Sequence, residues 1–131
     1  MKKFKLHQFD PTIYPMKLWI AEGGSKTDIA EVFLDKDNDP LCVTPDTLTN
    51  SLALTFNYVC HVESNKIGVL VWLLSNSVDV EIITHEAVHV ASAIFKNIGS
   101  RVETDNDEPF AYLVGFAADC IRQVSTHKFR E

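Results

Sequence analysis

The chain has 131 residues, 46% of them hydrophobic and 23% charged, which predicts one folded domain over residues 1–131 and excludes a disordered chain. Its formal net charge of −6 argues against a nucleic-acid partner, because neutralising phosphates requires a basic surface. Three widely spaced cysteines without a CxxC pair exclude a zinc ribbon, and no signal-like or membrane-length apolar segment is present, so we expect a cytoplasmic protein that does not bind membranes.

The first half of the chain is typical of strands and turns. Its apolar and alternating runs predict four β-strands, at residues 16–21, 29–34, 52–62 and 67–74. The segment 63–66 between the last two has the composition of a hairpin turn. Residues 35–40, DKDNDP, form either a polar turn or a calcium loop, and the missing glycine and distal glutamate of an EF-hand favour the turn.

The second half predicts two helices. Ser77 or Asp79 can cap the first helix, which runs to about Asn97 and ends at Gly99. The second follows the polar residues 105–107, carries Pro109 in its first turn and continues to about residue 126. The order of the elements predicts an α+β fold in which a small, mostly antiparallel sheet packs against two C-terminal helices.

The first helix contains the pentapeptide HEAVH, with His85, Glu86 and His89. Ile83, Ala87, Val90, Ile94 and Ile98 share one stripe of this helix, which predicts that the stripe faces the sheet. Imidazoles at i and i+4 lie one turn apart on the same face, so they can bind one Zn²⁺ ion. Glu86 lies beside them, where a carboxylate can take a proton from a metal-bound water without being a ligand.

A third ligand is expected in the second helix, where Glu108 follows His89 after an eighteen-residue gap. HExxH-x18-E resembles the gluzincin zinc aminopeptidases, whose third ligand lies in an Asn-Glu-Gly-Phe-Ala segment. Residues 107–111 of this chain read Asp-Glu-Pro-Phe-Ala. The resemblance covers about residues 78–120, and it implies a minimal zincin-like domain with ligands His85, His89 and Glu108 and with Glu86 as the catalytic base.

The chain departs from that family in two places. No Gly-x-Met-Glu-Asn type segment, which binds the substrate amino terminus, precedes His85, and Tyr112 stands where thermolysin-like enzymes have an aspartate. Tyr112 could orient His85 or donate to an oxyanion, or it could be an ordinary boundary tyrosine. Gly115 would allow the two helices to approach closely, and the strand at residues 67–74 is the expected partner of an extended substrate.

These features predict a zinc-dependent peptidase acting on a peptide or protein substrate. A metal-activated water would attack the peptide carbonyl, with Glu86 as general base. Two alternatives stay open: a catalytically inactive zincin-like module that binds metal or a protein partner, and a metal-free α+β protein in which HEAVH is accidental. The sequence does not indicate the cleavage specificity or the oligomeric state.

Overall fold

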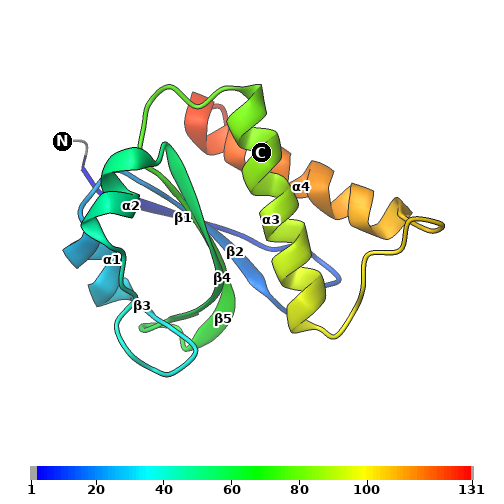
Figure 1. Cartoon of the computed structure of the whole chain (residues 1–131), viewed down its shortest axis with the longest axis horizontal. Coiled ribbons are helices and arrows are strands. Elements are labelled where there is room, and N and C mark those ends of the chain that lie inside the picture. Colours follow the sequence, from blue (N-terminus) through cyan, green and yellow to red (C-terminus); the bar gives the residue numbers. More distant parts are fainter. Residues whose placement is uncertain (1–2, 131) are drawn as a thin grey trace.

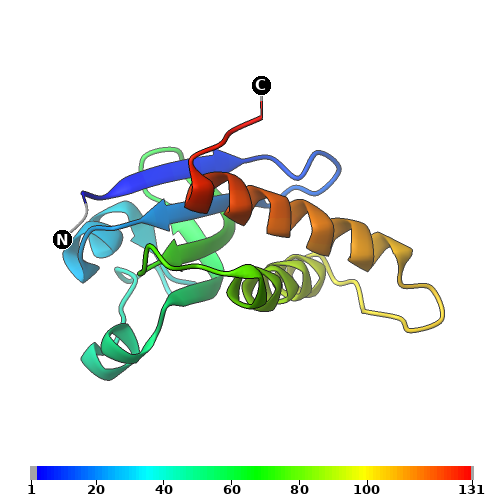
Figure 2. The ribbon, with the colours of Figure 1, turned by 90° about the horizontal axis from the view of Figure 1, so that it is seen from above.

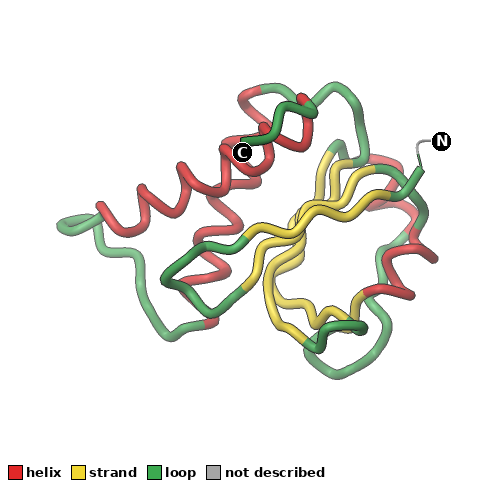
Figure 3. The backbone as a smooth tube through the Cα atoms, turned by 180° about the vertical axis from the view of Figure 1, so that it is seen from behind, coloured by secondary structure: helices red, strands yellow, loops and turns green. Residues whose placement is uncertain are grey.

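The structure is a computed structural model that describes residues 3–130 of the chain. Its elements, in chain order, are β1 (Lys5–Phe9), β2 (Lys17–Glu22), α1 (Lys26–Val32), β3 (Phe33–Leu34), α2 (Pro45–Asn50), β4 (Ala53–His61), β5 (Lys66–Leu73), α3 (Val80–Asn97) and α4 (Glu108–Thr126). The fold is α+β, as expected: α3 and α4 lie on one side of a curled sheet, and the short helices α1 and α2 lie on the other (Figures 1, 2 and 3). Among the described residues, no helix is long and apolar enough to cross a membrane.

The sheet is mixed, which corrects the prediction of a mostly antiparallel sheet. Its strand order is β1-β2-β5-β4-β3. The central pair, β2 and β5, is parallel, whereas the other neighbours are antiparallel. The expected hairpin of β4 and β5 is confirmed, but the chain enters it only after crossing over from β2 through α1, β3 and α2.

Continuous burial of β2 and β5 explains why these two strands form the centre. Residues 18–21 of β2 and 69–73 of β5 are apolar and buried on both faces of the sheet, as is typical of parallel strands. The pairing of β2 and β5 begins at Gly68. A Cβ at this position would lie 2.1 Å from the backbone oxygen of Lys17. The two backbones can therefore approach only because position 68 carries no side chain.

Three elements differ from the prediction. The segment at residues 29–34, expected as a strand, is mostly helix α1, because Ser25 and Asp28 form a reciprocal capping box that begins the helix. Only the last two residues of the segment pair as β3. Strand β1 and helix α2 were not predicted: β1 has only partly buried or exposed residues, and α2 buries none.

The two long helices begin and end close to the predicted residues. Asp79 accepts a hydrogen bond from the backbone N–H of Ile82 and so caps α3, and the chain leaves the helix through Gly99 at φ +79°. Pro109 occupies the first turn of α4, where its missing N–H leaves no helical bond unmade.

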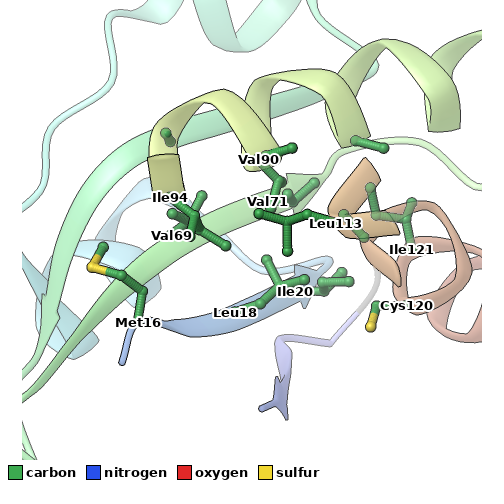
Figure 4. Packing of buried hydrophobic residues seen from close by; sticks show 14 of the residues in the cluster. Met16, Leu18, Ile20, Val69, Val71, Val90, Ile94, Leu113, Cys120 and Ile121 are labelled. Carbon is green, nitrogen blue, oxygen red and sulfur yellow. The ribbon is translucent and has the colours of Figure 1, made fainter. Parts of the chain in front are cut away.

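The larger core lies between the sheet and the long helices (Figure 4). Leu18 and Ile20 of β2, together with Val69 and Val71 of β5, meet helix residues of the same cluster. α3 contacts β4 and β5, whereas α4 contacts β2 and α3. A second cluster on the opposite face includes Trp19, Trp72 and Phe33 and is covered by α1.

Candidate metal centre

The outward face of α3 carries the two histidines of the HEAVH segment. Ala87, Val90 and Ile94 are fully buried against the sheet, which confirms the predicted stripe and turns His85 and His89 to the other side of the helix. The two Nε2 atoms lie 3.2 Å apart, and the ring centroids are 4.7 Å apart. The two imidazoles, one helical turn apart, therefore lie within hydrogen-bond distance of each other, as the i, i+4 spacing predicts.

Glu86 is buried between α3 and the sheet, on the inner side of the histidine pair. It is 8% exposed, and its Oε1 accepts a hydrogen bond of 2.6 Å from Thr55 Oγ1 of β4. Its Oε2 lies 4.0 Å from Nε2 of His85. Thr55 thus fixes one carboxylate oxygen, while the other lies beside the histidine pair.

Thr55 is a site residue that the sequence did not reveal. It lies 31 positions before Glu86, in a strand whose sequence shows only the alternation of apolar and polar residues. A threonine among β-forming residues is expected for propensity alone, so no local signal marks it as a partner of the helix. Only the packing of α3 on β4 brings the two side chains together.

A shallow pocket of about 250 Å³ opens beside this cluster. It is lined by Leu52, Ala53, Glu81, Ile82, His85 and Glu86. Glu81 and His85 are exposed, and the His85 side chain retains 66% of its accessible surface. Solvent and a small ligand can therefore reach one side of the histidine pair, whereas Glu86 closes the inner side.

The structure does not bring Glu108 to the histidines. α4 begins at Glu108, and Phe110 in its first turn packs on Phe95, with ring centroids 5.5 Å apart. Phe95 lies six residues beyond His89, which is about 9 Å along a helix axis. Among residues 3–130, no group of three or more His, Cys, Asp or Glu side chains is arranged to hold a metal ion.

Tyr112 and Gly115 also lie apart from the pair. Tyr112 is 77% exposed on the outer face of α4. A Cβ built at Gly115 meets nothing within 4 Å, so this glycine does not serve a close approach of the two helices, contrary to the prediction. α4 packs against the flank of α3 that carries Phe95, and the histidine face stays uncovered.

Strand β5 cannot receive a substrate strand, because β2 and β4 pair with its two edges. This corrects the expectation for residues 67–74. The edge of β4 is largely unpaired: within residues 3–130, β3 pairs only with Cys60 and His61, so Ala53 to Val59 have no strand partner on that side, although the Asn97 side chain donates to the backbone oxygen of Asn57. The start of this edge, at Ala53, also lines the pocket that contains His85.

No protein-family model, curated protein or solved structure matches the chain.

Proposed function

We propose that the protein is a zinc-dependent peptidase of zincin-like fold, in which His85 and His89 hold the metal and Glu86 is the general base. The separation of the two histidine nitrogens carries the proposal. Two nitrogens at about 2.05 Å from a tetrahedral Zn²⁺ lie about 3.3 Å apart, and the Nε2 atoms here are 3.2 Å apart. The pair therefore fits two positions of a zinc coordination shell.

Glu86 has the placement that a base requires. Its buried position and its bond to Thr55 keep the carboxylate in one orientation, with Oε2 on the side of the histidines. Zinc bound there would polarise a peptide carbonyl and lower the pKa of a bound water towards ~7. Glu86 would take the water proton on Oε2 and later deliver it to the leaving amine.

The free edge of β4 is the proposed place for an extended peptide. A chain that adds to residues 53–56 gains backbone hydrogen bonds, and it passes the pocket formed by Ala53, His85 and Glu86. Thr55 then has two roles: its backbone belongs to the strand that receives the substrate, and its side chain orients the base. The substrate class is therefore an unfolded peptide or an extended loop of a protein.

The resemblance predicts Glu108 as the third ligand, whereas the structure places Glu108 apart from the histidines, and zinc affinity decides between the two. In the described structure Glu108 lies apart from the histidines, so Glu108→Gln should leave the zinc dissociation constant unchanged, whereas His89→Ala should raise it by at least about tenfold. A tenfold loss of zinc affinity in Glu108→Gln would instead identify Glu108 as a zinc ligand. The measurement is competition for Zn²⁺ against a chromophoric chelator.

Hydrolysis is tested with Glu86→Gln, because glutamine keeps the size of the side chain and an oxygen for Thr55. We expect it to retain one zinc per chain by elemental analysis and to lose at least about 100-fold in kcat/KM on a quenched-fluorescence peptide library. Glu81→Gln is the matched control, since Glu81 is an exposed residue of the same helix and pocket, and it should stay within about threefold of the parent.

Three results would contradict the proposal. Equal hydrolysis by the parent and Glu86→Gln removes Glu86 as the base. Stoichiometric zinc without cleavage of any library member supports instead the inactive module that binds metal or a partner. Absence of zinc after reconstitution leaves HEAVH as a feature of a metal-free protein.

A further inference from the structure

The histidine pair of α3 supplies only half of a zinc coordination shell. His85 and His89 fit two of the four positions of a tetrahedral ion, with their Nε2 atoms 3.2 Å apart. Among residues 3–130, no third His, Cys, Asp or Glu side chain is arranged with the pair to hold a metal. The part of the chain that the structure describes therefore leaves two positions of the ion open.

The face of α3 that carries the pair is accessible to a partner as large as a protein. Three uncharged side chains, those of Thr84, Val88 and Ser92, are exposed beside the histidines. The exposed charged residues of α3, Glu81 and Lys96, lie about one and two turns beyond the pair. A second helix can therefore approach the ion without burying an unpaired charge.

A second copy of the same chain carries the missing ligands. In a two-fold symmetric pair, the two imidazoles of one copy approach the ion from one side and the same two imidazoles of its partner from the other. A tetrahedron sets the planes of the two histidine pairs at right angles, so the two α3 helices cross steeply and touch only near the ion. The direct contact is then small, and zinc has to supply most of the affinity.

We propose that zinc joins two copies of this chain through a four-histidine site, to which each copy contributes His85 and His89. The inference rests on the zinc binding that is part of the proposed function, but not on hydrolysis. In the dimer the ion has no open position for a water molecule, and the partner covers the pocket lined by Glu81 and His85. The bridged dimer is therefore a resting form, and the monomer with its own ion is the form that acts on a peptide.

Sedimentation velocity of the full chain at about 0.1 mM, with EDTA or with increasing zinc, tests the proposal. The chain should be a 14.7 kDa monomer in EDTA, and its mass should about double at half an equivalent of zinc. Several equivalents of zinc give each chain its own ion, so at least about half of the dimer should then dissociate. Non-specific association through zinc would instead increase steadily with the metal. A phosphine reductant keeps the free cysteines from joining chains by disulfides.

Two serine variants provide the matched control. Ser92 is exposed about one turn after His89, so Ser92→Arg places a bulky cation between the crossing helices. It should lower the affinity of the dimer at least about tenfold and leave the zinc affinity of the monomer within about threefold of the parent. Ser100 is exposed beyond the end of α3, so Ser100→Arg should dimerise as the parent does. His85→Ala, with one imidazole per chain, should stay monomeric at every ratio of zinc to chain.

The outcomes separate this inference from the proposed function. A parent that binds one zinc per chain and stays at 14.7 kDa at every ratio would overturn the dimer and leave the proposed peptidase standing. A dimer that persists in EDTA, or equal dimerisation by the two serine variants, would also overturn it. A zinc-bridged dimer whose zinc-loaded monomer cleaves no peptide would support the inference and contradict the peptidase.

Discussion

Replacing Thr55 with valine tests whether Glu86 is held as the structure describes. Valine keeps the shape and the β propensity of threonine, so the change removes little except the hydroxyl that donates 2.6 Å to Glu86 Oε1. Glu86 is 8% exposed, so water has little access to replace the lost donor. A hydrogen bond to a charged group contributes roughly 1.5–3 kcal/mol, and we expect a loss of about 2 kcal/mol in the free energy of unfolding.

The expected loss is large enough for two simple assays. At about 2.1 cal/mol/K per residue, a chain of 131 residues has an unfolding entropy near 275 cal/mol/K, so about 2 kcal/mol lowers Tm by about 7 °C. Chemical unfolding in urea, with EDTA present to exclude metal, measures the free energy directly. A double-mutant cycle with Glu86→Gln isolates the coupling between the two side chains.

The control for this prediction is Thr49→Val. Thr49 also donates through its hydroxyl, to the backbone oxygen of Pro45 at 2.8 Å, but it is exposed, so water can replace the bond. Its loss should stay below about 0.5 kcal/mol. Equal effects of the Thr55 and Thr49 replacements would refute the reasoning that Thr55 anchors a buried carboxylate.

Three further predictions concern other residues of α4. Gly115→Ala should raise the free energy of unfolding by about 0.5–1 kcal/mol in urea titrations, because a Cβ there meets nothing within 4 Å and alanine favours helix. The hydrogen bond from Arg130 lowers the pKa of Asp119 from 3.8 to about 2. The Asp119 carboxylate therefore stabilises the fold fully above pH 4, and this contribution is lost as the pH falls towards 2. The parent should exceed Asp119→Asn in free energy of unfolding by about 1 kcal/mol or less above pH 4, and the difference should disappear over that range. Burial raises the pKa of the Cys120 thiol to about 12, so at pH 8 iodoacetamide should modify the exposed Cys42 and leave Cys120 intact by mass spectrometry.

These predictions have matched controls. Gly99 has φ +79°, so Gly99→Ala should destabilise the fold by about 1 kcal/mol although its Cβ also meets nothing; equal effects at positions 99 and 115 would contradict the argument from backbone conformation. A parent-to-Asp119→Asn difference that does not change between pH 5 and 2 would contradict the argument from the carboxylate. Rapid alkylation of Cys120 in the folded chain would contradict its burial.

Local sequence signals located most of the elements and the hairpin of β4 and β5, but not the parallel pairing of β2 with β5. The alternation of β4, the cap at Asp79 and the proline of α4 all lie within a few residues of the structure they specify. The parallel pairing of β2 with β5 depends on contacts between residues that are far apart in the chain. Their uninterrupted apolar runs were the available signal, since parallel strands are buried on both faces.

In the candidate site, too, the local arrangement could be predicted from the sequence and the long-range arrangement could not. The i, i+4 spacing alone sufficed to bring His85 and His89 together, because the helix geometry is local. The position of Glu108 depended instead on how two helices cross, and the prediction assumed that a helical hairpin would bring it back to the pair. The contact of Phe110 with Phe95 sets a different crossing, and no spacing along the chain encodes it.

The parallel pairing of β2 with β5 also determines when β2 can find its central partner during synthesis of the protein. Lys17 pairs with Gly68, so β2 has no central partner until the chain has grown by about fifty more residues. At 5–20 residues per second, the ribosome needs about 3–10 s to make that length. During this interval the apolar β2 is exposed, and its only available strand partner is the antiparallel neighbour β1. We therefore expect the nascent chain to be most dependent on chaperones, and most prone to aggregation, between the emergence of β2 and that of β5.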